Sequence, residues 1–221
     1  MPSETHDLLI DNDQGSPTLI LAHGAGAPMD SDFMQAVTER LVAAGVCVVR
    51  FEFPYMAGRR IDGKKRGPNS AKVLEATWRE IIAQVCDARD LTAAQIVIGG
   101  KSMGGRIASM LADDADVAGL VCLGYPFHPT GKPEKLRTEH LEAIATPSLC
   151  LQGTRDPFGK QEEVEGYALS EHFQVAWLED GDHSFKPRKR SGRTLDQNLD
   201  EACEAILSFL EKRTALDRAV S

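Results

Sequence analysis

The sequence has 221 residues, of which 42% are hydrophobic and 26% are charged, a composition typical of soluble globular proteins. This length suits one domain, and we treat residues 1–221 as a single unit with its core over about 18–212. The formal net charge of −8 argues against general nucleic-acid binding. The polar start, Met1 to Gly15, lacks the apolar segment of a secretory signal, and no uncharged stretch is long enough to cross a bilayer. We therefore expect neither a nucleic-acid nor a membrane partner.

Five cysteines are spread along the chain, and no two lie close enough for a C-x-x-C site. Cys47, Cys122 and Cys150 fall in apolar runs, where cysteine behaves as a small apolar side chain. The sequence predicts neither a disulfide framework nor a metal site, and a reducing cytoplasmic location fits this pattern.

Short apolar runs alternate with helix-forming segments. The expected strands are 8–10, 18–22, 46–53, 95–98, 118–125, 147–152 and 173–178. The expected helices cover about 32–44, 72–89, 106–112, 162–170 and 195–212, and a long basic segment from Tyr55 to Ser70 is expected to be a loop. Continuously apolar strands that alternate with helices predict an α/β fold, with a mostly parallel sheet covered on both faces. In such sheets the chemistry gathers at the carboxyl ends of the strands.

The segment 99–105, Gly-Gly-Lys-Ser-Met-Gly-Gly, lies between an expected strand and an expected helix. This is the context of a G-x-S-x-G nucleophile elbow, in which Gly100 and Gly104 allow a turn that strains Ser102. The hydroxyl would then stand at the N-terminus of a helix, which favours negative charge. An ordinary glycine-rich turn with a solvated serine is the alternative. We predict that Ser102 is a nucleophile.

A serine hydroxyl needs a base to accept its proton, and the base needs an acid to orient it. His183 follows the last expected strand in a Gly-Asp-His turn and is the candidate base. Asp156 follows the preceding strand and is the candidate acid, although Asp before Pro157 is also a common turn former. Asp180 and Asp182 compete for this role, but Asp182 adjoins His183, and neighbours in an extended chain point apart.

Two backbone N–H groups are the candidates for an oxyanion hole, those of Ala25 and Met103. Met103 follows the candidate nucleophile, and Ala25 follows His23-Gly24 after the strand 18–22. His23 is expected to fix this loop rather than to act as the base. The alternative for this segment is a flexible turn.

Lys101 and two basic segments, Tyr55 to Ser70 and Lys186 to Arg193, are candidates for binding an anionic substrate. The candidate ligands in these segments are Arg59, Arg60, Lys64, Lys65, Arg66, Arg188 and Lys189. Both segments follow expected strands, so we expect a positive rim at the edge of the sheet that carries the candidate nucleophile. Solvated surface charge is the alternative.

The order Ser102, Asp156, His183 and the position of each after a strand resemble the α/β-hydrolase superfamily, over residues 18 to 212. The chain looks most like its small, capless members of the dienelactone-hydrolase size. The strings at 22–26, 100–105 and 152–159 are similar to a branch that includes hydrolase-like testis-expressed proteins and a subunit of a chromatin acetyltransferase complex.

The resemblance implies a serine hydrolase that forms an acyl-enzyme on a small-molecule ester or thioester, with no metal or organic cofactor. The alternative is a weakly active or inactive module that binds a protein partner, although a scaffold has no need of all three residues. Haloalkane or epoxide chemistry would need an aspartate where Ser102 stands. The sequence leaves the oligomeric state open.

Overall fold

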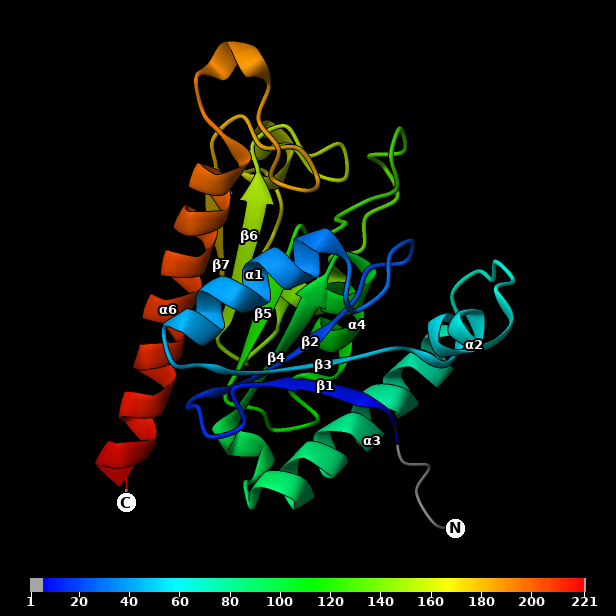
Figure 1. Cartoon of the computed structure of the whole chain (residues 1–221). Coiled ribbons are helices and arrows are strands. Elements are labelled where there is room, and N and C mark those ends of the chain that lie inside the picture. Colours follow the sequence, from blue (N-terminus) through cyan, green and yellow to red (C-terminus); the bar gives the residue numbers. More distant parts are fainter. Residues whose placement is uncertain (1–5, 221) are drawn as a thin grey trace.

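The computed structural model describes residues 6–220, with side chains as far as Arg213. Residues 1–5, which belong to the polar start, and Ser221 lie outside the described residues. Within the described part, seven strands form one sheet in the order β1-β3-β2-β4-β5-β6-β7 (Figure 1). The strands are β1 Leu8–Asp11, β2 Thr18–Ala22, β3 Cys47–Phe51, β4 Ile96–Lys101, β5 Gly119–Leu123, β6 Ser148–Gly153 and β7 Phe173–Leu178.

Only β1 runs antiparallel, against β3, and every other pair of neighbours is parallel. The predicted α/β class and the mostly parallel sheet are therefore confirmed. The α-helices are α1 Asp32–Ala43, α2 Pro54–Asp62, α3 Ala71–Arg89, α4 Met103–Leu111, α5 Gln161–Val164 and α6 Leu195–Val220. Short 3₁₀ turns are η1 Ala93–Gln95, η2 Glu139–Glu142 and η3 Lys189–Ser191.

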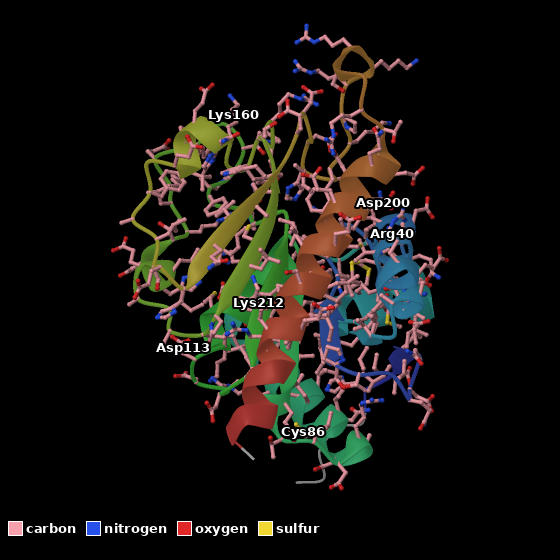
Figure 2. All side chains as sticks on the ribbon, turned by 90° about the vertical axis from the view of Figure 1, so that its left-hand side faces the viewer. Arg40, Cys86, Asp113, Lys160, Asp200 and Lys212 are labelled. Atoms are coloured by element: carbon pink, nitrogen blue, oxygen red, sulfur yellow. The ribbon has the colours of Figure 1, made fainter. Side chains whose placement is uncertain are left out.

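Side chains that alternate along each strand divide the interior into two apolar layers. In β4, Ile96 and Ile98 join the layer that α3 and α4 cover, whereas Val97 joins the layer of α1 and α6. This is the period of two that a pleated strand imposes. Figure 2 shows α1 and α6 side by side, where Arg40 donates from Nε to Asp200 at 2.7 Å. The same alternation determines which side chains near the candidate nucleophile point to its face of the sheet and which point to the opposite face.

Three expectations about the elements were wrong. The start of the segment from Tyr55 to Ser70 is the helix α2, with Pro54 at its first turn, where proline fits well. Tyr55 and Met56 are buried, and this packing outweighs the basic and glycine-rich composition. The helix expected over 162–170 is only Gln161–Val164, and the final helix extends to Val220.

Cys47, Cys122 and Cys150 are buried in strands, as predicted. Within residues 6–220, none of the helices combines the length and the apolar character that a bilayer crossing would require.

Candidate active site

Ser102 lies between β4 and α4 with φ 51° and ψ −113°, a conformation that a residue with a side chain rarely adopts. Such a strained position persists only when its surroundings enforce it. Both flanking glycines are required by space, because a Cβ on Gly100 would lie 2.4 Å from the carbonyl oxygen of Ala22. A Cβ on Gly104 would lie 2.6 Å from that of His23. The predicted sharp turn at Ser102 is therefore present.

The structure brings Ser102, His183 and Asp156 into one line of hydrogen bonds. His183 Nε2 lies 2.9 Å from Ser102 Oγ, and His183 Nδ1 lies 2.7 Å from Asp156 Oδ2. Asp156 is fully buried, and its Oδ1 accepts the N–H of Phe158 at 2.9 Å. An ionised carboxylate can only accept a hydrogen bond, so Nδ1 carries the proton and donates to Asp156. The unprotonated Nε2 then accepts a hydrogen bond from the serine hydroxyl. This arrangement suits proton transfer from Ser102 to His183.

The competing acids have other partners. Asp182 Oδ1 accepts the N–H groups of Ser184 and Lys186, at 2.8 and 3.0 Å, and so closes the turn that follows β7. Asp180 pairs with Arg188, and this guanidinium lowers the pKa of Asp180 to about 2. Among these three acids, Asp156 is the one hydrogen-bonded to the imidazole.

The loop after β2 approaches the elbow closely. A Cβ built on Gly24 would lie 3.7 Å from Ser102 Cβ, so the adjacent Ala25 lies near the nucleophile. Met103 begins α4, where an N–H has no acceptor in a preceding turn. The Tyr55 hydroxyl donates to the carbonyl of Ala25 at 3.0 Å and fixes the loop from α2.

His23 is buried and serves the same loop. Its Nδ1 lies 2.7 Å from the carbonyl oxygen of Gly24, and its Nε2 accepts the N–H of Phe53 at 3.2 Å. Burial lowers the pKa of His23, which keeps the ring neutral and suited to this pair of bonds. The expectation that His23 fixes the loop agrees with these contacts.

The structure does not place Lys101 where a substrate contact would need it. Lys101 follows Val97 and Gly99 on the face of β4 that α1 and α6 cover, because side chains alternate along the strand. Its ammonium donates to the backbone carbonyl of His183 and lies 5.2 Å from the ring centroid of Phe33 and 5.8 Å from that of Phe185. Burial lowers its pKa to about 8. Lys101 thus supports the His183 turn from behind.

The predicted basic rim is not one cluster. β3 precedes the first segment and β7 precedes the second, and these strands are five places apart in the sheet. At about 4.8 Å per strand the two segments start about 24 Å apart. Figure 1 shows α2 (cyan) and the loop that carries η3 (orange) at different ends of the molecule.

Several of the rim residues are also neutralised by carboxylates. Arg60 makes bidentate contacts with Glu52 at 2.7 Å and contacts Asp30 at 2.7 and 3.1 Å. Arg66 pairs with Asp62, and Arg188 pairs with Asp180. The remaining rim residues lie half-buried or exposed on the surface, and they are Arg59, Lys64, Lys65 and Lys189. The expectation that the two segments together frame the site was wrong, because the strand order separates them and because three of their arginines pair with carboxylates.

Sequence reasoning assigned no role to two residues that support the site. The ring of Phe158 packs on that of His183, with centroids 4.4 Å apart. Gln152 is fully buried at the end of β6, donates to the carbonyls of Tyr125 and Gly159, and accepts the N–H of Tyr125. It thereby joins the ends of two strands. A glutamine at the end of an apolar strand was a usable signal. Phe158 lies within the string 152–159 that carries the family resemblance, but nothing in the sequence indicated that it contacts His183.

Comparison with known proteins identifies the family. Residues 15–211 match the family described as alpha/beta hydrolase domain. The chain belongs to this family. Its fold is similar to that of an alpha-beta serine hydrolase homologue from Coxiella burnetii, with 20% identity, 90% of each chain covered and a TM-score of 0.68.

Two further hydrolase structures resemble the chain. A serine hydrolase without lid from Xanthomonas campestris is 17% identical over 92% of this chain and 90% of its own, with a TM-score of 0.66. A dienelactone hydrolase from Anabaena variabilis is 22% identical over 89% and 88%, with a TM-score of 0.64. At these identities the likeness concerns the fold, and it agrees with the capless architecture predicted from the sequence.

Proposed function

We propose that this α/β hydrolase is a serine hydrolase that cleaves carboxylic esters or thioesters through an acyl-enzyme. The observation that carries the proposal is the line of hydrogen bonds from Ser102 through His183 to the buried Asp156. Solvated serines and turn-forming aspartates have no reason to share one histidine between its two nitrogens. The strained backbone of Ser102 adds weight, because strain of this kind concentrates at functional sites.

In the proposed reaction, Ser102 Oγ attacks the acyl carbonyl while His183 Nε2 accepts its proton. Asp156 holds the imidazole in the required tautomer and stabilises the imidazolium. The N–H groups of Met103 and Ala25 stabilise the negative oxygen of the tetrahedral intermediate. His183 then protonates the leaving alcohol or thiol. Water, deprotonated by the same imidazole, later releases the acid and restores Ser102.

A fluorophosphonate probe tests the proposal directly, because it phosphonylates an activated serine. The wild-type protein should be labelled at Ser102, and Ser102→Ala should not be labelled while it keeps the thermal stability of the wild type. Turnover should then be measured on p-nitrophenyl esters and acyl-CoA thioesters. Labelling at another serine would overturn the assignment of the nucleophile.

Lack of any labelling would favour the other function expected from the sequence, a hydrolase-fold module that binds a protein. The similarity of the strings at 22–26, 100–105 and 152–159 to the branch with testis-expressed proteins bears on this second function and stays a prediction.

A further inference from the structure

A cavity of about 560 Å³ lies between α4 and the segment that leads into η2. Its lining consists of Arg106, Met110, Leu136, Arg137, Glu139 and His140. Neither arginine was singled out from the sequence, because they are 31 residues apart and each stands outside the two basic segments. The fold brings both to one cavity of a size suited to a small organic ligand.

Both arginines lack the acidic partner that most arginines of this protein have. Within the described side chains, no carboxylate oxygen lies within 4.0 Å of either guanidinium, and the buried Nε of Arg106 has no hydrogen-bond partner. Elsewhere the arginines that do contact a carboxylate are Arg40, Arg50, Arg60, Arg66, Arg79, Arg155, Arg188 and Arg193. Among the described side chains, the charges of these two guanidiniums are therefore not neutralised by an acid.

The charges around the cavity repel one another. Burial, and then the Arg106 guanidinium, lowers the pKa of Arg137. Burial and Arg106 also lower the pKa of His140, although Glu139 and Asp113 act in the opposite direction. The exposed Glu139 is the one acid in the lining, and with a neutral His140 it leaves the cavity with a net positive charge. Such a cavity favours an anion.

The backbones of the two arginines are also held in place from the core. The hydroxyl of Ser109 donates to the carbonyl of Arg106 at 2.7 Å, and that of Tyr125 donates to the carbonyl of Arg137 at 2.9 Å. His140 Nε2 lies 2.8 Å from Ser109 Oγ and 3.5 Å from the Tyr125 hydroxyl, so one network joins both backbones. These bonds fix the backbone positions from which both arginine side chains extend, and a fixed backbone lowers the entropy cost of binding a ligand.

One wall of the cavity lies on α4, the helix that begins directly after the candidate nucleophile. The N–H of Arg106 donates to the carbonyl of Ser102 at 2.9 Å, which places Arg106 one turn of α4, about 5 Å of rise, beyond Ser102. Met103, Arg106 and Met110 follow the spacing of one helix face. An ester with its carbonyl at Ser102 would therefore need an anionic end that extends along this face of α4.

We propose that Arg106 and Arg137 form a subsite for an anionic oxygen group of the substrate, a carboxylate or a phosphate, carried on the ester that Ser102 cleaves. The planar guanidinium suits both groups, because its N–H donors match two oxygens of either one. The role in hydrolysis rests on the function proposed above, whereas anion binding itself does not. This subsite replaces the basic rim as the basis for an anionic substrate.

Two p-nitrophenyl esters of equal acyl-chain length test the proposal, the neutral valerate and the mono-ester of glutaric acid. The wild type should have the higher kcat/KM for the glutarate. Arg106→Gln and Arg137→Gln should each lower kcat/KM for the glutarate roughly 10- to 100-fold, the range expected for a hydrogen bond to a charged group. The valerate should change less than about twofold, since it lacks the anion. Arg190→Gln, which removes an exposed charge on η3, is the matched control and should change neither.

Calorimetric titration of Ser102→Ala with glutarate and with inorganic phosphate separates this subsite from catalysis and the carboxylate from the phosphate. Binding of either anion that is lost in Ser102→Ala/Arg106→Gln supports the subsite, even if the protein hydrolyses no ester. Ester hydrolysis without a preference for the glutarate, together with no binding of either anion, would overturn the subsite and leave the hydrolase function intact. If Arg106→Gln does not fold, Arg137→Gln and Arg106→Lys carry the same comparison.

Discussion

The imidazole and the backbone carbonyl of His183 lie in two different environments. The ring, in a side chain that is 23% exposed, contacts Ser102 and the fully buried Asp156. The carbonyl accepts a hydrogen bond from Lys101 within the apolar layer of Phe33 and Phe185. His183 is thus held from two sides. We call the side of its ring, with Ser102 and Asp156, the front of the site, and the side of its carbonyl, with the buried ammonium of Lys101, the rear side.

This difference shows that two residues adjacent in the sequence can contact the same site from opposite sides. Lys101 and Ser102 are adjacent, yet the last residue of β4 points into the layer of α1 and α6, and the turn sends Ser102 the other way. Gly124 completes the rear side, because a Cβ there would lie 2.7 Å from Lys101 Nζ and 3.0 Å from the His183 carbonyl oxygen. We expect changes in front to abolish chemistry and changes behind to weaken it.

The largest effect is expected in front. Ser102→Ala and His183→Ala should each lower kcat by about 10⁴- to 10⁶-fold, because nucleophile and base act as a unit. Steady-state hydrolysis of a p-nitrophenyl ester measures this. His172→Ala, at an exposed histidine just before β7, is the matched control and should keep wild-type activity. Substantial turnover by Ser102→Ala would place the chemistry elsewhere.

The second effect separates two acids in front. Asp156→Asn should lower kcat by roughly 10³–10⁴-fold, because an amide at this position favours the wrong tautomer of His183. Asp182→Asn should cost much less, since Asp182 accepts only backbone N–H groups of its own turn. Measured kcat values for both variants, at matched thermal stability, make the comparison. A severe loss in Asp182→Asn with a mild one in Asp156→Asn would reverse the assignment of the acid.

The front of the site was predictable because its residues follow a local pattern. Strand ends, a glycine-flanked serine and the chain order of Ser102, Asp156 and His183 each leave a signal in sequence, and so do the apolar strands of a parallel sheet. The order of the strands in the sheet leaves no such signal, and it is what separates the two basic segments.

The rear side and the new subsite were not predictable for a related reason. Whether an arginine is paired depends on acids distant in sequence, as with Arg60 and Asp30. For Arg106 and Arg137 it depends on the absence of a nearby acid among the side chains that the structure describes. Helix α2 was missed because its stability comes from the burial of Tyr55 and Met56 rather than from helix propensity.

The third effect tests the rear side. Lys101→Met keeps the apolar stem and removes the ammonium, so the His183 turn loses one anchor while the contacts in front remain. We expect kcat on a neutral ester to fall about tenfold, the scale of one hydrogen bond, with little change in KM. Lys186→Met, at an exposed lysine of the same loop, should have no effect. An unchanged kcat in Lys101→Met would mean that the rear contact does not position His183.

Lys101→Met also tests how the stability of the protein depends on pH. Burial lowers the pKa of Lys101 from 10.5 to about 8, against the influence of Asp156 and Asp182. Between these two values the unfolded chain holds a proton that the folded protein has lost, so the free energy of unfolding rises with pH. Urea denaturation should therefore show the wild type gaining stability relative to Lys101→Met from about pH 8 upward. A constant difference across this window would contradict a buried ammonium at Lys101.

The smallest effect is expected from the basic segments, which lie away from both sides of His183. Arg59, Lys64 and Lys65 have no carboxylate within 4.0 Å among the described side chains, and they lie at the surface around the end of α2. Exposed charges steer an anionic ligand over a distance that salt limits, so they act on the encounter and not on the bound state.

Changing Arg59, Lys64 and Lys65 together to Gln should lower kcat/KM for the glutarate mono-ester by less than about threefold at low salt. The effect should vanish near 1 M salt, where the Debye length is about 3 Å. The loss in Arg106→Gln should largely persist there, since a partly buried contact is screened less. A salt-resistant loss in the triple variant as large as that in Arg106→Gln would mean that the α2 segment binds the substrate directly.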